Sequence, residues 1–429
     1  MLALRILILS FLIPDEIGVQ VGDLALSVYR IVLIALTPYI LKQMISKAHR
    51  VNWNSCDLLA VLLIIWPFIS FGMNTGFAAS IESGGIFALE MAVPYFLVRL
   101  LVNSRSRRVE LAKYVFQMTA VLFFLGLPEA LLGQHFTHQL AHALVGESYT
   151  GMAEQRFGIW RALGPLDHAI LFGTLCTTSV ALSLNMMSLK RRYLWILAFS
   201  IGGAILSASS APILSAMVQL SLYAWATTMQ RYRNKWLILV AILALAYLFI
   251  DVLSNRDPIR VMFSYLLLNP TTGYARYYMW ILSFDVVAQS TWGMVFGYGY
   301  DIEIFNVLEN DYWRILMQNT VDSFWLVVML RHGITMLILF AVFVILVLRK
   351  AVRSSRISES RRDRRLIQAW FICALGMTLV ASTVHFWGQM VCVYFIVLAT
   401  CVGASTKRQS SKKVKQYEKL ERRSATRAL

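Results

Sequence analysis

Long apolar runs dominate the sequence and limit the folds that are open to it. WLILVAILALAYLFIDVL (236–253) and ITMLILFAVFVILVL (334–348) approach the roughly 20 residues that a helix needs to cross ~30 Å of hydrocarbon. Because 58% of the residues are hydrophobic and only 15% are charged, soluble domains cannot bury so much apolar surface. No alternating ten-residue barrel pattern competes with these runs. We therefore expect an all-α, polytopic integral membrane protein whose residues 1–429 form one transmembrane domain.

The N-terminus and the cysteines do not change this class. No small-residue cleavage site precedes Pro14, so residues 2–14 are expected to form a retained first helix rather than a removed signal peptide. The cysteines lie in or beside apolar segments without the spacing of metal ligands. Buried, unpaired thiols are therefore expected, and no disulfide is predicted.

The positive charge is arranged for orientation in a membrane. Net charge +17 falls into short clusters between apolar runs, a pattern that argues against nucleic-acid binding. We expect these clusters in the cytoplasm: residues 42–50, 103–108, 189–192, 230–235, 349–365 and the basic tail 404–429, which is attracted to anionic membrane lipids. The intervening outer segments contain Asp, Glu and some Arg but no Lys.

Counting alternations predicts about twelve spans with both termini cytoplasmic, at ~20 residues per span. Residues 320–350 are too long for one straight span, and two crossings would place the cluster 349–365 outside. We therefore predict one crossing preceded by a half-helix at the outer face, with a break at Arg331-His332-Gly333. Irregular backbone at that depth needs protein or water around it, so a cavity is expected there.

Four charged residues lie inside the predicted spans. Arg5, Arg30, Glu90 and Arg99 all lie within a few turns of a span end. An intramembrane charge is a candidate functional group, but snorkelling or a structural ion pair explains these positions more simply.

Two outer segments, 129–166 and 254–320, are too long to be simple connections, and both are rich in aromatic residues and Leu. We expect them to form short amphipathic helices at the interface. In the second, a turn at NPTTG (269–273) precedes a predicted helix with Thr271 or Thr272 near its cap. Arg276 would lie in the first or second turn of that helix.

Arg276 is a candidate anion ligand. An Arg beside a helix N-terminus combines forked donors with free backbone N–H groups, which suits phosphate. A guanidinium binds phosphate through two bonds and tolerates partial burial better than an ammonium does. The alternative is a structural pair with Asp257, Asp301 or Glu309 in the same loop.

The first long loop offers further candidates in FGIWRALGPLDHAILFG (157–173). Arg161 is a second ligand for the same anion, while Asp167 and His168 lie near the outer end of the following span. Upstream, His135, His138 and His142 share one helical face. Metal binding by these imidazoles is an alternative, but no acidic ligand lies nearby in the sequence, and no metal site is predicted.

The order and spacing of several segments resemble the Wzy-type polysaccharide polymerase and O-antigen ligase superfamily. The segments that carry the resemblance are RALGPLDHAILFG (161–173), ILSASSAPILSA (205–216), GYARYYMWILSFDVV (273–287), FGYGY (296–300) and VDSFWLVVMLRHG (321–333). The resemblance implies a GT-C-like membrane enzyme at the periplasmic face of the bacterial inner membrane. Such enzymes transfer glycans from undecaprenyl diphosphate to an acceptor hydroxyl without a nucleotide sugar, a cofactor or an obligatory metal.

The resemblance also implies roles for individual residues. Arg161 and Arg276 match the arginines thought to hold the lipid diphosphate. The chain departs from the ligases, which carry His-Asn at Asp322-Ser323, and from many members with Arg at Ser209-Ser210. Asp322 is therefore the candidate base, because a partly buried Asp can have a raised pKa suited to accepting a proton. Alternatively, Asp322 is the N-cap of the half-helix 323–331. The secondary candidates are His168, Asp167, Arg314, Ser209 and Ser210.

Three functions remain in competition with the leading one, a polymerase of lipid-linked repeat units for an exopolysaccharide or capsule. A ligase that passes glycan to the lipid A core would use the same arginines. A transporter or flippase would show two similar halves and ionisable residues near the midplane, which the sequence lacks. A non-catalytic scaffold would leave the lysine-free outer loops unexplained. Expected partners are the lipid-linked donor and acceptor glycans, a flippase and a chain-length regulator.

Overall fold

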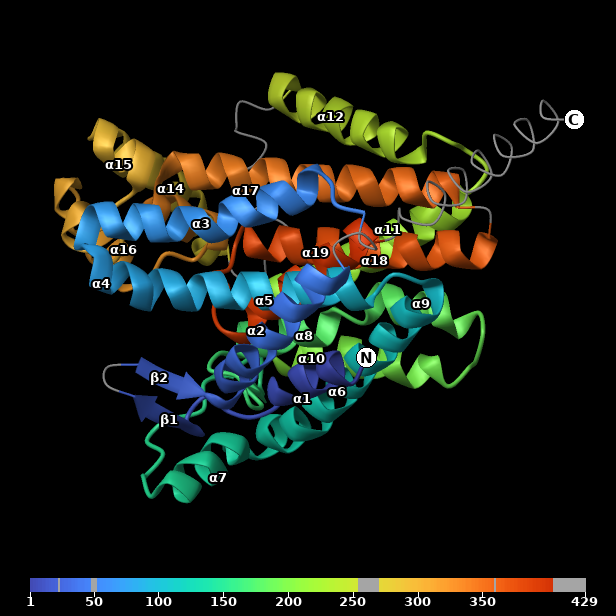
Figure 1. Ribbon diagram of the computed structural model, residues 1–429, viewed down its shortest axis with the longest axis horizontal. Helices are drawn as coiled ribbons and strands as arrows, with labels where there is room; N and C mark the ends of the chain where they lie inside the picture. The colour runs from blue at the N-terminus through green and yellow to red at the C-terminus, as the bar shows by residue number, and fades with distance from the viewer. Residues whose placement is uncertain (22–23, 48–51, 254–269, 359, 404–429) are drawn as a thin grey trace, which may run out of the picture.

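The computed structural model describes residues 1–21, 24–47, 52–253, 270–358 and 360–403 (Figure 1). Within these residues the chain is almost entirely helical. The extended elements are two antiparallel hairpins, β1 (Gly18–Val21) with β2 (Leu24–Ser27) and β3 (Gln155–Arg156) with β4 (Ile159–Trp160). The predicted all-α class is confirmed.

The helices follow the apolar runs. Those of the first half are α1 (Leu2–Ser10), α2 (Val28–Lys47), α3 (Ser55–Thr75), α4 (Phe77–Ala79), the π-helix Ser80–Gly84, α5 (Gly85–Leu101), α6 (Arg105–Leu132), α7 (Phe136–Val145), α8 (Ala169–Thr177) and α9 (Val180–Met187). Those of the second half are α10 (Tyr193–Leu206), α11 (Ser210–Thr228), α12 (Lys235–Leu253), α14 (Pro270–Ala288), α15 (Thr291–Phe296), the 3₁₀ helix Glu303–Val307, α16 (Asp311–Asn319), α17 (Phe324–Ile357), α18 (Arg361–Ala381) and α19 (Gln389–Gly403).

The chain is an integral membrane protein. In the described part of the chain, eight helical segments are long and apolar enough to cross a bilayer: 28–46, 55–75, 80–101, 105–132, 169–187, 235–253, 324–357 and 361–381. Helices α10 and α19 are apolar but shorter. The total number of spans, about twelve, stays a prediction.

Helix α19 lies at the centre of the bundle, and every residue from Gln389 to Gly403 is buried. It packs against α5, α17 and α18, as Figure 1 shows for the red and orange helices. A helix that is apolar on all sides requires such surroundings. Helix α12 is the opposite case, because it lies at the edge of the bundle and most of its apolar side chains are exposed. In a membrane protein that surface suits lipid.

The predicted break in α17 is confirmed at Gly333, where φ is +82°. A turn from the FGYGY segment (296–300) covers the break: the Tyr298 N–H donates to the Leu330 carbonyl at 2.8 Å, and the Gly299 N–H donates to the Arg331 carbonyl at 3.1 Å. A Cβ atom on Gly333 would lie 2.2 Å from the Val295 carbonyl oxygen. Protein therefore satisfies the irregular backbone at this break, where a cavity had been expected.

Structural ion pairs account for most of the charges inside the bundle. Arg30 Nε lies 3.1 Å from the Glu90 carboxylate, and Arg99 Nε lies 2.6 Å from Asp57. Both carboxylates are buried, and each also accepts a tyrosine hydroxyl. These pairs satisfy charges that would otherwise be costly in a low dielectric. The structural interpretation of Arg30, Glu90 and Arg99 is confirmed, while Arg5 is exposed.

The long loops gather at one end of the bundle, which we call the loop end (Figure 1, left). It contains α14, α15 and α16 beside α4 and the β1–β2 hairpin. The segment 129–166 begins inside α6 and continues as α7 and the β3–β4 hairpin. Of the segment 254–320, residues 254–269 lie outside the described chain. The opposite end, which we call the basic end, holds residues 230–235, 354–358 and 360–365.

Candidate functional site

The linker between α18 and α19, residues 382–388, draws the segments of the loop end together. The Phe324 N–H at the start of α17 donates to the Val384 carbonyl at 3.0 Å. The Trp280 indole on α14 donates to the Ser382 carbonyl at 3.2 Å. The linker therefore fixes where α14 and α17 stand relative to each other.

Arg276 lies in the second turn of α14 and is only 9% exposed. Its Nη2 lies 3.4 Å from Asp322 Oδ2, at the edge of hydrogen-bond range. Its Nε is buried and has no partner in the described part of the chain. An unsatisfied buried donor costs about 1–3 kcal/mol, so this guanidinium has spare capacity for an anion. The alternative prediction that Arg276 pairs with Asp301 or Glu309 is wrong. The third residue of that prediction, Asp257, lies outside the described residues.

Asp322 stands just before α17 and is not its N-cap. Ser323 is the N-cap, because its Oγ accepts the Leu326 N–H at 3.4 Å. The N-cap interpretation of Asp322 is therefore wrong. The Asp322 carboxylate accepts the Thr320 hydroxyl at 2.9 Å and faces Arg276, while 41% of its side chain stays exposed. A carboxylate that is positioned by two donors and still reaches solvent can accept a proton from an incoming hydroxyl.

Arg161 follows β4 and is buried with partners on every side. Its Nη1 pairs with Glu154, its Nε donates to the Ser207 carbonyl at 3.3 Å, and its Nη2 donates to Ser209 Oγ at 3.0 Å. Ser209 is the N-cap of α11, and Ser210 is its first residue. The structure thus joins Arg161 directly to Ser209, both predicted, and adds Glu154, which could not be selected from the sequence, as a second partner of Arg161. An anion can reach Arg161 only in competition with Glu154.

Buried contacts with α6 hold the loop that carries Arg161. The Glu129 carboxylate accepts the N–H groups of Leu163 at 2.9 Å and Gly164 at 2.8 Å. Gly164 has φ +57°, a conformation that favours glycine. Burial alone would raise the pKa of Glu154, but hydrogen bonds from Arg161 and Arg156 outweigh it and hold that pKa below its ordinary value. The Arg161 pair is therefore a charged, preorganised unit.

His168 interacts electrostatically with both Arg161 and Asp322. It is the N-cap of α8, and its Nδ1 accepts the Ile170 N–H at 3.1 Å. Burial and the charge of Arg161 together lower the pKa of His168 to about 4, against the opposing effect of Asp322. The ring is neutral near pH 7, and because Nδ1 accepts a bond, the proton lies on Nε2. His168 is therefore placed to donate a hydrogen bond rather than to act as a base.

Asp167 turns toward the linker and the N-terminal segment. The Trp387 indole donates to Asp167 Oδ2 at 3.1 Å. Burial and the charge of Asp167 together raise the pKa of Asp15 to about 7. Asp15 in turn accepts a hydrogen bond from Gln389. Asp167 thus belongs to a neighbouring carboxylate cluster.

His385 and Trp387 are loop-end residues that the sequence analysis did not select. Their ring centroids lie 5.4 Å apart, and Trp387 also lies 6.2 Å from the His168 ring. Burial and the charge of Arg331 together lower the pKa of His385 to about 3. The only signal in the sequence was an imidazole and an indole in one short outer segment, HFWGQ (385–389).

Arg314 and the α7 histidines take structural roles. Arg314 pairs with Asp311 in its own helix. His138 Nδ1 lies 2.5 Å from Glu16, and His135 lies 3.6 Å from Glu129, so the assumption that no acidic residue is nearby was wrong. Even so, the described residues contain no group of three side chains that could hold a metal ion.

No protein-family model and no curated protein matches the chain. The chemistry of the loop end therefore has to indicate the function. It provides an arginine with a free buried donor, Arg276, beside an accessible carboxylate, Asp322. It also provides a neutral imidazole donor, His168, near a second arginine, Arg161. Such a set can bind an anionic leaving group and accept a proton from a nucleophile.

Proposed function

We propose that the protein is a Wzy-type glycosyltransferase that polymerises undecaprenyl-diphosphate-linked oligosaccharide repeat units of an exopolysaccharide or capsule. The reaction would take place at the periplasmic face of the bacterial inner membrane. The observation that carries the proposal is the meeting of Arg276 and Asp322, which are 46 residues apart in the chain. Among the described residues, the Arg276 Nε has no hydrogen-bond partner. This proposal agrees with the resemblance in the sequence.

The donor's diphosphate would bind Arg276 and loosen its long contact with Asp322. A guanidinium can hold two phosphate oxygens at once, and the free Nε already points to a missing acceptor. As the bond between the sugar C1 and the diphosphate oxygen breaks, the diphosphate gains negative charge. One preorganised donor at such a position is worth about 2.7–4 kcal/mol in the transition state.

Asp322 would serve the acceptor glycan. Once Arg276 turns to the diphosphate, the carboxylate is free to accept the proton of the attacking sugar hydroxyl, whose oxygen forms the new bond to C1. The products are a glycan longer by one repeat and a released lipid diphosphate. The balance needs no redox partner and no nucleotide sugar, so the proposal includes no cofactor.

His168 and Arg161 would complete the diphosphate site. A neutral imidazole donates a hydrogen bond from Nε2 without adding charge, while Arg161 adds a cation that Glu154 holds in position. Both groups stand near the start of α8. The expected partners are a flippase that delivers the donor and a regulator that sets chain length.

An O-antigen ligase is the second candidate, and one observation favours it. Ligases carry His at the position of Asp322, and here the loop end has imidazoles from two other segments, at His168 and His385. Either ring would supply the imidazole that the segment around Asp322 lacks. A ligase would pass the glycan to the lipid A core with the same arginines.

Glycan analysis of a deletion strain tests the proposal. A polymerase deletion leaves single repeats on the carrier lipid, whereas a ligase deletion leaves long chains that are not attached to the core. A transporter deletion traps the lipid-linked repeat in the cytoplasm. Restoration by the wild-type chain, but not by a chain with Arg276→Lys, ties the phenotype to the loop end. Unchanged polymer in the deletion strain would overturn the proposal.

A further inference from the structure

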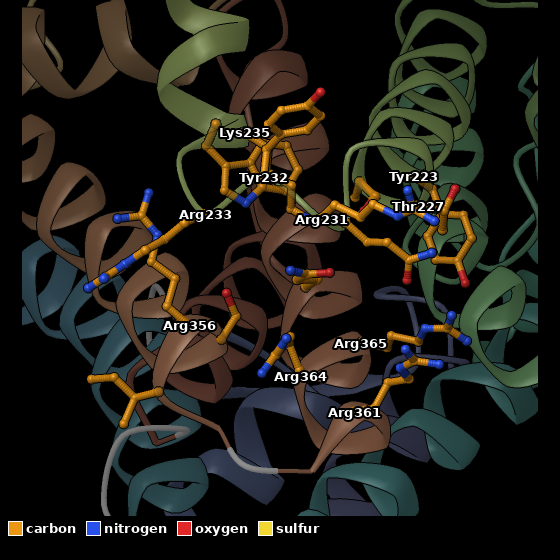
Figure 2. Close-up of a pocket in the computed structure, with 16 residues that line it drawn as sticks. Tyr223, Thr227, Arg231, Tyr232, Arg233, Lys235, Arg356, Arg361, Arg364 and Arg365 are labelled. Atoms are coloured by element: carbon orange, nitrogen blue, oxygen red, sulfur yellow. Dashed lines mark hydrogen bonds between the residues drawn. The ribbon is translucent and has the colours of Figure 1, made fainter.

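A pocket of about 750 Å³ lies at the basic end (Figure 2). One wall is formed by Arg231 and Arg233, in the linker between α11 and α12, and by Lys235, the first residue of α12. The facing wall is the junction of α17 and α18, which contributes Arg356, Arg361 and their neighbours. Figure 2 shows these cationic side chains on opposite sides of an open space. None of the described residues that line it carries a carboxylate.

The six lining arginines have no carboxylate within ion-pair distance in the described part of the chain. They are Arg231, Arg233, Arg356, Arg361, Arg364 and Arg365. The carboxylate of Asp363, which lies between lining residues on α18, pairs instead with Arg108 at 2.6 Å. Like charges that share a concave surface repel one another and raise the local concentration of anions. The missing partner of this pocket is therefore anionic.

A second, independent sign is the indole of Trp236, which lines the same pocket. Trp236 is 8% exposed, and its Nε1 is buried without a partner among the described residues. Its ring is fixed by Phe371, with centroids 4.7 Å apart, and by the Lys235 ammonium, 5.6 Å from the ring centroid. A rigid, unsatisfied N–H beside several cations calls for an oxygen acceptor.

We propose that this pocket binds a ligand that carries at least two phosphate charges. The number of cations exceeds what one monoanion can neutralise, and arginine forks suit phosphate oxygens. The ligand is the paired phosphates of an anionic lipid headgroup or a soluble diphosphate, which share this chemistry. The site is separate from the loop end and does not depend on the glycosyltransferase proposal.

The surroundings of the pocket are compatible with a lipid source. Helix α12 begins at the pocket with Lys235 and Trp236 and then exposes apolar side chains along most of its length. A lipid with its phosphates in the pocket can therefore lay its acyl chains against α12. Basic pockets between transmembrane helices are known to bind phosphate headgroups in this way.

The test uses the full-length purified protein and two probes. In one arm, native mass spectrometry counts cardiolipin molecules retained from nanodiscs of phosphatidylcholine doped with cardiolipin. In the other, calorimetry measures binding of inorganic pyrophosphate in a zwitterionic detergent. The pocket variant is Arg361→Gln with Arg365→Gln. The matched control is Arg353→Gln with Arg362→Gln, which removes the same charge from exposed residues that do not line the pocket.

We expect the pocket variant to bind about tenfold more weakly or worse, and the control to bind like the wild type. Cardiolipin binding alone identifies a lipid headgroup as the ligand, and pyrophosphate binding alone identifies a soluble diphosphate. The Trp236→Phe variant removes the N–H together with part of the ring, keeps all the arginines, and should weaken binding by a smaller factor. It tests the proposal even if the double variant does not fold. Absence of binding by both probes, or equal losses in pocket variant and control, overturns the proposal.

Discussion

The two ends of the bundle use arginine in opposite ways. At the loop end, Arg161 and Arg276 each face a carboxylate, Glu154 or Asp322. At the basic end, arginines gather around a pocket with no lining carboxylate among the described residues. Paired arginines are held in one geometry, which suits chemistry at a defined atom. Crowded, unpaired arginines bind by charge, which suits an anion of less defined shape.

The loop end contains a second contrast. Each of the three guanidinium nitrogens of Arg161 donates a hydrogen bond, whereas Arg276 has a buried Nε without a partner in the described chain and a single long contact. A satisfied guanidinium contributes to stability, and an unsatisfied one is available for a ligand. Arg276 should therefore matter for function and Arg161 for both function and stability.

The largest effect is expected for Asp322→Asn. The change keeps the size of the side chain but removes its capacity to accept a proton, so turnover should fall by about 10²–10⁴-fold with little loss of donor binding. Polymer formation and donor binding by the purified protein are the two measurements. Asp311→Asn, on an exposed carboxylate of α16, is the matched control and should leave turnover unchanged. Retained turnover in the Asp322 variant would assign the base to another group.

Arg276→Lys comes next. The charge stays, but the fork that spans two phosphate oxygens is lost, so polymer formation should fall by about 10²–10³-fold while the protein level stays the same. Chain length on a glycan gel, beside an immunoblot, measures both. Arg314→Lys, in a pair within α16, is the control and should support normal polymer. If the Arg276 variant makes chains of normal length, the loop end does not bind diphosphate through two bonds.

Local patterns predicted much of this fold. The spans follow from apolar length, and the break at Gly333 follows from an apolar stretch too long for one span. The helix that carries Arg276 was also predicted, but the turn expected at NPTTG (269–273) is wrong, because α14 already begins at Pro270. Each of these signals lies within a few turns of the residue concerned, so a single sequence contains it.

Contacts between distant segments could not be predicted in the same way. The ion pair of Arg161 with Glu154 depends on the β3–β4 hairpin, whose strands have two residues each. The position of His385 depends on the linker 382–388, which forms hydrogen bonds with other helices. The N-cap of α17 was misassigned because Asp322 and Ser323 are both good caps, and only the backbone conformation separates them. Partner choice in a bundle depends on packing, which spacing along the chain does not specify.

A smaller effect distinguishes the two loop-end arginines by stability. Arg161→Gln removes one of the two donors of the Ser207 carbonyl and the donor of the Ser209 hydroxyl, so the free energy of unfolding should fall by about 1–3 kcal/mol. Arg276→Gln removes only a long contact to a half-exposed carboxylate and should cost about 0–1 kcal/mol. Thermal unfolding in detergent compares the two variants. Equal losses would mean that Arg276 is as fully satisfied as Arg161.

The smallest effect concerns pH and His168. Its pKa is about 4 in the folded protein against an ordinary value of 6.5, so between these values the unfolded chain binds more protons. This contribution to stability is therefore complete above pH 6.5 and is lost as pH falls toward 4. His168→Asn keeps an acceptor for the Ile170 N–H but cannot titrate. Unfolding temperatures between pH 4 and 7 should depend less on pH in this variant than in the wild type.

The pH dependence of the transfer rate shows whether His168 acts as a neutral hydrogen-bond donor. A neutral ring donates from Nε2 at every pH above about 4, so the transfer rate should not fall as pH rises through 6.5. A rate that did fall there, and no longer fell in the His168→Asn variant, would require a cationic imidazole. The loop end would then hold a third positive charge beside Arg161 and Arg276. The two ends would no longer differ in whether their cations are paired with carboxylates, but only in how many cations they hold.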